Sequence, residues 1–156
     1  MKFINTKNQL RLEILDELLS ELYQEGMKHY PKEFGGILIG RYSDDNNSCI
    51  VVKTILPKVY KSSNLLFERG IKGLKAQLLS YFKQEPKLIY LGEWHTHPDS
   101  SPIPSKTDKK AMSEIENYKE VKIQFPILLI LGINADSFSV GAYIQYNKQL
   151  LNYEKE

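Results

Sequence analysis

The sequence predicts a mixed α/β fold in which about three helices pack on a mostly antiparallel sheet. Amphipathic helical segments are interspersed among apolar, strand-like segments, and most of the latter are joined by short polar turns typical of hairpins. The composition, 42% hydrophobic and 26% charged over 156 residues, is that of an ordinary globular protein. A chain of this length can bury a core of its own. We therefore expect a single domain over residues 1–156.

The first half is expected to contain a helix followed by a hairpin. Apolar side chains recur at helical spacing over residues 10–29, which predicts an amphipathic helix that ends at Pro31. Residues 35–42 and 49–56 are apolar runs separated by an Asp/Asn/Ser-rich turn, and they predict two paired strands. Residues 59–64 could be strand, loop or both.

The second half alternates helices with strands. Residues 71–83 predict a helix that stops before Pro86. One face of this helix is expected to carry its apolar side chains, Ile71, Leu74, Leu78, Leu79 and Phe82. The remaining elements are a strand over 88–95, an irregular Pro- and Ser-rich connection over 99–104, a helix from Ser105 to about Tyr118, and a hairpin of 126–133 and 137–146 around 134–136.

Charge and cysteine content exclude several functional classes. A net charge of +2, with acidic and basic residues evenly mixed, does not indicate a nucleic-acid partner. The single cysteine, Cys49, excludes an intrachain disulfide and a cysteine-rich structural zinc site, and we expect it to be a small buried residue in a strand. No signal-peptide pattern and no membrane-spanning apolar run is visible. We therefore expect a cytoplasmic protein with no membrane partner.

The most informative segment is His95-Thr96-His97-Pro98. Side chains alternate along a strand, so the two imidazoles project to one side, while Trp94 and Thr96 face the other, where we expect Trp94 to pack in the core. Two histidines at this spacing, where a strand meets a loop, favour metal ligands over a buried hydrogen-bonded pair. With a carboxylate as third ligand and water as fourth, they would form a catalytic zinc site.

Asp108 can supply that carboxylate, but its spacing from Ser105 has a simpler explanation. Ser followed three residues later by an acidic residue is a capping-box pattern, which needs no function. Both interpretations can hold together, because a ligand in the first helical turn would be positioned by the cap. The histidines, and the prolines of the intervening connection, favour the metal interpretation.

A zinc hydrolase also needs a group that carries protons. Glu93 lies two residues before His95 and shares its face, which makes it a candidate base or a partner of that histidine. Glu33 precedes the buried strand over 35–42. Spacing alone does not decide between the two carboxylates.

Glu33 with the following Gly-Gly-x-Leu-x-Gly, then His95-Thr96-His97-Pro98, Ser105 and Asp108, resembles the JAMM (MPN-plus) metalloprotease family. The family motif is an upstream Glu followed by H-x-H-P-x(6)-S-x-x-D, and every position is present at the family's spacing. A chance match of all these positions is improbable compared with that of a short motif. The order of predicted elements also suits the JAMM/MPN-type α/β fold.

This resemblance implies specific roles. His95, His97 and Asp108 would hold one Zn²⁺ per chain, Glu33 would activate water as general acid and base, and Ser105 would donate a hydrogen bond to the oxyanion. Family members cleave peptide or isopeptide bonds beside ubiquitin or ubiquitin-like modifiers. The expected partner is therefore such a modifier, or a protein conjugated by E1- and E2-like enzymes.

Residues 92–98 and Phe67-Glu68-Arg69 most resemble the compact bacterial members of the family, which occur in mobile elements and in antiphage (CBASS) operons. A substrate tail is expected to lie extended along an edge near residues 58–64 or near the loop after His97. Two alternatives stay open: a peptidase that processes sulfur-carrier proteins, and a non-catalytic MPN scaffold. A scaffold should have lost its metal ligands, and here all three are intact.

Overall fold

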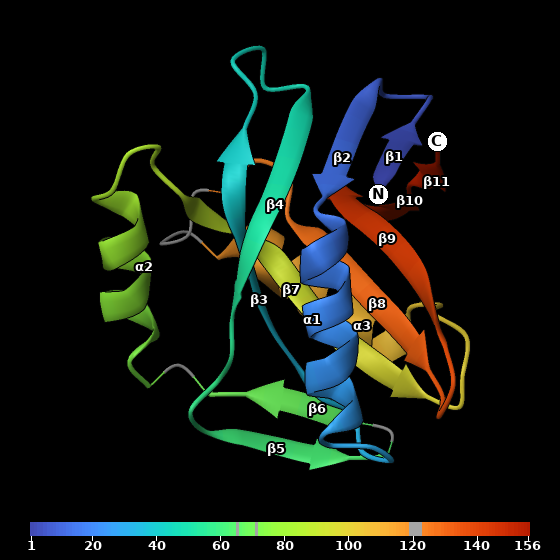
Figure 1. The fold of residues 1–156 in the computed structure, drawn as a ribbon. Helices are drawn as coiled ribbons and strands as arrows, with labels where there is room; N and C mark the ends of the chain where they lie inside the picture. Colours follow the sequence, from blue (N-terminus) through green and yellow to red (C-terminus); the bar gives the residue numbers. More distant parts are fainter. Residues whose placement is uncertain (65, 71, 119–122) are drawn as a thin grey trace.

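The protein is described by a computed structural model that covers residues 1–64, 66–70, 72–118 and 123–156. Within these residues one large sheet has the strand order β10-β9-β8-β7-β3-β4-β2-β1-β11 (Figure 1). Its strands are β1 (Lys2–Asn5), β2 (Leu10–Ile14), β3 (Gly35–Tyr42), β4 (Ser48–Ile55), β7 (Ile89–Pro98), β8 (Ile127–Ile133), β9 (Phe138–Tyr146), β10 (Gln149–Asn152) and β11 (Glu154–Lys155). The pairs β2–β4 and β7–β8 are parallel and the others antiparallel. The predicted mixed, mostly antiparallel α/β class is thus confirmed.

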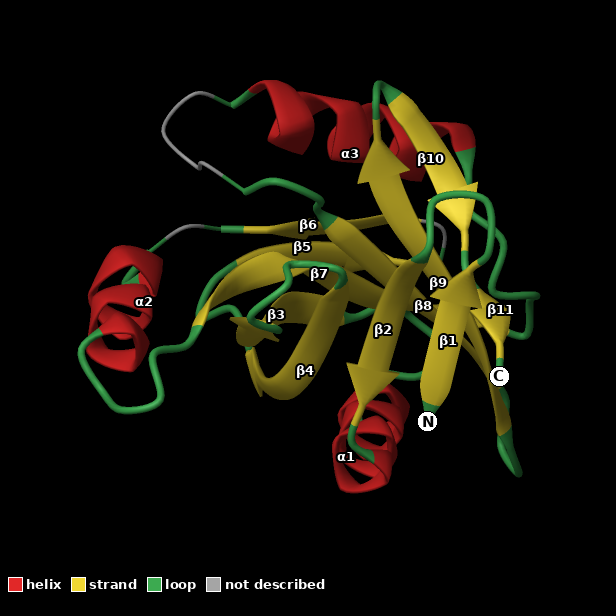
Figure 2. Ribbon diagram, turned by 90° about the horizontal axis from the view of Figure 1, so that it is seen from above, coloured by secondary structure: helices red, strands yellow, loops and turns green. Residues whose placement is uncertain are grey.

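The other described elements lie outside this sheet. A separate hairpin pairs β5 (Tyr60–Ser63) with β6 (Leu66–Arg69). The helices are α1 (Asp16–Met27), α2 (Leu74–Phe82) and α3 (Lys106–Asn117). Figure 2 shows α1 and α3 on opposite sides of the sheet. No helix in the described part of the chain is long and apolar enough to cross a membrane.

The central strand β8 explains why the sheet is covered on both faces. All seven residues of β8 are buried. Leu129 and Leu131 join the cluster that includes Leu22 of α1, whereas Leu128 packs with Met112 of α3. A strand covered on both sides needs a continuous apolar sequence rather than an alternating one. This explains the Ile-Leu-Leu-Ile-Leu run, and the expected hairpin of β8 and β9 is confirmed.

The start of the predicted first helix was wrong. Residues 10–14 form β2, which pairs in parallel with β4, and the helix begins only at Asp16. Leu10, Leu12 and Ile14 are all buried. Their spacing of two fits a strand as well as it fits part of a helical face, and strand pairing decides in favour of the strand.

The predicted second helix is shorter than expected, and its apolar face was partly wrong. α2 begins after Gly73, whose φ of 76° lies in the left-handed region that glycine favours. Leu74 and Leu78 pack against a small apolar cluster, but Leu79 and Phe82 are each 50% exposed. Ile71, expected at the start of this helix, lies outside the described residues.

Candidate metal centre

Both histidines lie within β7, which extends to Pro98 and not only to residue 95 as expected. β7 is paired with β3 on one side and with β8 on the other, so His95 lies opposite Gly35 and Ile130. A Cβ at Gly35 would come within 2.8 Å of the Cα of His95, so this position tolerates only glycine. Both imidazoles are buried and project from the same face of the strand, because they are two residues apart.

The two rings meet through their Nε2 atoms, which are 3.0 Å apart. Nδ1 of His97 lies 3.1 Å from the carbonyl oxygen of Ser101. A carbonyl can only accept, so this Nδ1 carries the hydrogen, and Nε2 of the neutral ring keeps its lone pair. A backbone carbonyl that fixes the tautomer in this way is a typical partner of a metal-binding histidine.

Asp108 serves both the cap of α3 and the histidines. Its Oδ2 accepts the backbone N–H of Ser105 at 2.6 Å, while its own N–H donates to Oγ of Ser105 at 3.2 Å, which completes a capping box. Oδ1 lies 3.3 Å from Nε2 of His95, and Oδ2 lies 3.6 Å from Nε2 of His97. The cap therefore holds the carboxylate against the imidazoles, and the two interpretations of Ser105-x-x-Asp108 coexist.

The three side chains fit a zinc ion. Bonds of about 2.0–2.1 Å in a tetrahedral site place neighbouring ligand atoms about 3.3 Å apart. Nε2 of His95 lies 3.0 Å from Nε2 of His97 and 3.3 Å from Oδ1 of Asp108, both close to that value. One ligand atom from each of the three residues lies within 4.8 Å of the other two. Two imidazoles and one carboxylate are also the donor set of open, catalytic zinc sites.

The charges of this cluster are strongly coupled. Burial raises the pKa of Asp108, but hydrogen bonds to His95 and His97 outweigh burial and hold that pKa well below its usual range. Burial lowers the pKa of His97, but hydrogen bonds to Asp108 and to the Ser101 carbonyl leave it raised overall. The carboxylate is therefore ionised at neutral pH and stabilises a cation at this position.

Glu33 lies beside the cluster, in the connection between α1 and β3. Its side chain is buried, with Oε1 4.0 Å from Nε2 of His97. Burial raises the pKa of Glu33, the two histidines lower it, and Asp108 raises it; the result is a raised pKa. A carboxyl group whose pKa is moved toward neutrality is suited to both accepting and donating a proton.

The backbone around Glu33 is held from two sides by hydrogen bonds to residues that no sequence motif links to it. Its N–H donates to the carbonyl of Ser63 at 2.8 Å, and its carbonyl accepts the hydroxyl of Ser62. The next residue, Phe34, donates to Oγ1 of Thr96 at 3.0 Å, and the N–H of Thr96 donates back to the Phe34 carbonyl at 2.8 Å. Period-two alternation placed Thr96 away from the metal but could not reveal its partner.

The carboxylate of Glu93 is bound by Arg69 and Tyr90 rather than by the histidines. Nε of Arg69 donates to its Oε2 at 2.8 Å, and Nη2 donates to Oε1 at 2.5 Å. The hydroxyl of Tyr90 donates to Oε1 at 2.7 Å. Both oxygens are thus occupied by donors within the described chain, and the geometry favours Glu33 over Glu93 as the proton carrier.

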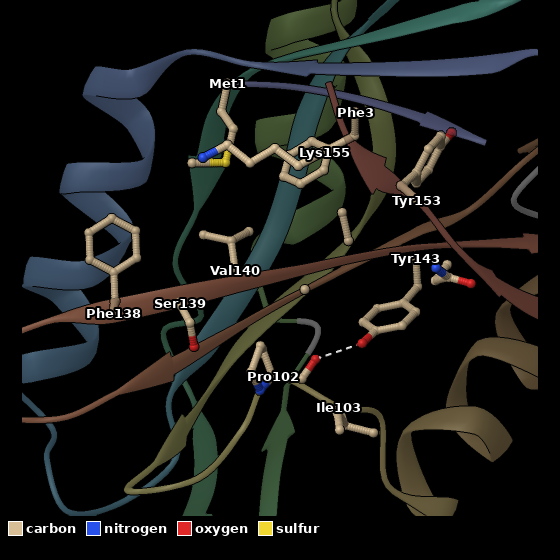
Figure 3. Close-up of a pocket in the computed structure, with 13 residues that line it drawn as sticks. Met1, Phe3, Pro102, Ile103, Phe138, Ser139, Val140, Tyr143, Tyr153 and Lys155 are labelled. Carbon is tan, nitrogen blue, oxygen red and sulfur yellow. Dashed lines mark hydrogen bonds between the residues drawn. The ribbon is translucent and has the colours of Figure 1, made fainter. Parts of the chain in front are cut away.

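The loop between His97 and Ser105 is held against β8 and β9. Figure 3 shows the hydroxyl of Tyr143 donating to the Pro102 carbonyl, at 2.7 Å. The loop closes one side of a groove of about 440 Å³ that runs between β9 and β1. None of His95, His97, Asp108 and Glu33 lines this groove, so it is separate from the candidate metal centre. The expected burial of Trp94 in the core is confirmed, with its indole donating to Oγ1 of Thr54.

Comparison with known proteins places these features in a family. A family model described as prokaryotic homologs of the JAB domain matches residues 15–141. A protein of Enterobacter hormaechei named CD-NTase/cGAS isopeptidase is 35% identical over 132 residues, which cover 83% of this chain and 70% of that protein. A protein of the same name from Pseudomonas aeruginosa is 31% identical over 105 residues, which cover 66% of this chain and 65% of that protein.

A solved structure is similar in fold. The solution structure of a Desulfitobacterium hafniense protein superimposes with a TM-score of 0.62, covering 92% of this chain and 90% of that one. Its sequence identity is 16%, so this likeness concerns the fold alone.

Proposed function

The chain belongs to the family of prokaryotic JAB-domain homologues and has a JAB/MPN-type α/β fold, and from this premise we propose that it is a zinc-dependent isopeptidase. Its substrate is the peptide or isopeptide bond at the C-terminus of a ubiquitin-like modifier, or of a protein joined to a target by E1- and E2-like enzymes. The observation that carries the proposal is the convergence of His95, His97 and Asp108, with the carboxylate of Glu33 4.0 Å from one imidazole.

In this mechanism His95, His97 and Asp108 would hold the zinc ion. When bound, zinc supplies a Lewis acid that polarises the substrate carbonyl and lowers the pKa of water. Glu33 accepts the proton of the attacking water and then delivers it to the leaving amine. Its raised pKa suits both steps, since a proton carrier works best with a pKa near the operating pH.

Ser105 is proposed to donate to the oxyanion that forms at the substrate carbonyl. Its oxygen already accepts the N–H of Asp108, and a hydroxyl can donate to one group while it accepts from another. Such a donor is typically worth about 2.7–4 kcal/mol in the transition state. Its place at the cap of α3 fixes it next to the metal ligand Asp108.

The substrate tail is proposed to bind in an extended conformation near the β5–β6 hairpin and the loop after His97. Apolar side chains are exposed on both: Val59 is 54% exposed beside the hairpin, and Ile103 is 65% exposed in the loop. Exposed apolar side chains beside a strand provide contacts for the side chains of an added strand, while backbone hydrogen bonds bind its main chain.

The names of the related proteins suggest which conjugated protein is the substrate. Because they are named CD-NTase/cGAS isopeptidases, we propose that the conjugated protein is a CD-NTase and that cleavage reverses its conjugation in an antiphage system. The alternative of sulfur-carrier processing has no comparable support among the relatives.

The test is cleavage of a purified CD-NTase conjugate by the zinc-loaded protein. Cleavage should disappear with a chelator and return with zinc, and the Glu33→Gln variant should be inactive. Elemental analysis should find one zinc per wild-type chain and much less in His95→Ala. Equal metal content in these two proteins, together with no cleavage, would favour the non-catalytic scaffold.

A further inference from the structure

The β5–β6 hairpin connects the two glutamates that the sequence offered as alternative bases. It is a separate two-stranded element at the lower end of the view in Figure 1. Arg69 lies at its open end, paired with Tyr60, while Ser63 lies at its closed end. Arg69 binds Glu93 of β7, and Ser63 binds the backbone of Glu33. The hairpin therefore links the strand of the histidines to the loop of the proposed base.

The contact at the open end is a partly buried ion pair with two hydrogen bonds between the guanidinium and the carboxylate. The side chains of Arg69 and Glu93 are only 21% and 16% exposed. The guanidinium donates through two nitrogens, and Tyr90 adds a third hydrogen bond to the carboxylate. By contrast, the Arg11–Glu156 pair has its arginine 58% exposed and a single contact of 3.3 Å. A bidentate pair fixes the direction of the two side chains as well as their distance.

The contact at the closed end acts on the backbone of Glu33. Its N–H and its C=O are both bound by the hairpin, to the Ser63 carbonyl and to the Ser62 hydroxyl. If the hairpin shifted, both hydrogen bonds would lengthen together. The orientation of the Glu33 carboxylate beside His97 thus depends on where the hairpin lies.

We propose that Arg69 and Glu93 are positioning residues. Their ion pair holds the β5–β6 hairpin against β7 and thereby keeps Glu33 in place beside the proposed metal ligands. The importance of Glu33 for turnover rests on the proposed function, whereas the mechanical link does not. On this proposal Glu93, two residues before His95, binds Arg69 and so attaches the hairpin to β7; it does not transfer protons.

Backbone hydrogen exchange in the zinc-loaded protein tests the link without any substrate. In Arg69→Gln the amide of Glu33 should exchange at least about tenfold faster, because removing one partner of this partly buried pair loosens the segment that the pair holds. The amide of Leu129, in the buried strand β8, should keep its rate. Arg69→Lys should give an intermediate rate, since lysine retains the charge but not the two-point contact. Arg11→Gln, which breaks the exposed pair, is the matched control and should leave Glu33 unchanged.

Two results would overturn the inference: an unchanged Glu33 rate in Arg69→Gln, or an increase that Leu129 shares equally and that therefore reports global unfolding. If Arg69→Gln does not fold, the same criteria apply to Arg69→Lys. In conjugate cleavage, Arg69→Gln should lower kcat while KM and zinc content are retained, with partial rescue in Arg69→Lys. A wild-type protein that cleaves no conjugate would refute the proposed function. The exchange rates would still show whether the Arg69–Glu93 pair holds the backbone of Glu33.

Discussion

Phe34 and Thr96 exchange two hydrogen bonds between the loop that carries the proposed base and the strand that carries both histidines. The Phe34 N–H donates to Oγ1 of Thr96, and the Thr96 N–H donates to the Phe34 carbonyl. Thr96 is completely buried and lies between the two histidines. Its side chain thus fixes the backbone next to Glu33 relative to the two histidines, from the opposite face of the strand.

The Thr96→Val variant removes this acceptor at nearly constant shape. It removes the side-chain acceptor of the buried Phe34 N–H, and the loss of such a buried hydrogen bond should cost about 1–3 kcal/mol of unfolding free energy. Chemical denaturation measures the loss. Thr6→Val, at an exposed position, is the control and should change stability little. Equal stability of Thr96→Val and wild type would show that the hydrogen bond has no net value.

The Glu33→Gln variant should separate metal binding from turnover. It is nearly isosteric and leaves the three proposed metal ligands intact, so zinc content should stay at the wild-type level. Turnover should fall by about 10²–10⁴-fold, the usual contribution of a positioned proton carrier. The exposed Glu114→Gln provides the matched control. Full activity in Glu33→Gln would return the role of base to Glu93.

The sequence was sufficient for the elements whose pattern is unambiguous. The apolar run of β8 and the polar turn before β9 predict a hairpin in any context, and the capping box of α3 is a local signal. The spacing of Leu10, Leu12 and Ile14 is compatible with one face of a helix and with one face of a strand. Only the pairing of these residues with β4, which is distant in the sequence, shows that they form a strand. Short segments such as β1 and β11 have no period of their own.

In the candidate site, too, local patterns predict some residues and long-range packing brings in the others. Spacing within one strand placed His95 and His97 on one face, and local helix geometry placed Asp108 beside Ser105. The partners of Glu33 could not be inferred, because Ser62, Ser63 and Thr96 reach it through long-range packing of a hairpin and a strand. The preference for Glu33 over Glu93 as the proposed base depends on the ion pair of Glu93 with Arg69, 24 residues earlier in the chain, which spacing alone does not reveal.

Asp108→Glu and Ser105→Ala should separate the two roles of the capping box. Glutamate is the common residue at this position of a capping box, so Asp108→Glu should retain the cap and most stability. It moves the carboxylate oxygens away from the imidazoles, so zinc binding should be weaker. Ser105→Ala should show the reverse, with zinc retained and about 1 kcal/mol of stability lost with the cap. Calorimetric zinc titration and thermal unfolding distinguish the outcomes; retained zinc affinity in Asp108→Glu would argue against Asp108 as a ligand.

Zinc affinity should depend on pH through His97. In the metal-free protein the pKa of His97 is raised above its ordinary value of 6.5, and a histidine must lose its proton to bind zinc. The protonated ring is favoured in the metal-free fold, so its contribution to stability is present below the ordinary pKa and is lost as the pH rises through the raised one. The stabilisation by bound zinc should change in the opposite direction and increase with pH, because deprotonation frees the imidazole nitrogen to bind the ion. Asp108, whose pKa is lowered, stays ionised throughout this range and adds no competing step.

The increase in Tm caused by a fixed zinc concentration measures this dependence, since a ligand stabilises the fold according to its affinity. The increase should be larger at about pH 8 than at about pH 6. His97→Ala should show little zinc-dependent increase at either pH, which controls for zinc bound elsewhere. A wild-type increase that is the same at both pH values would mean that zinc does not displace a proton from His97, and would remove this histidine from the ligand set.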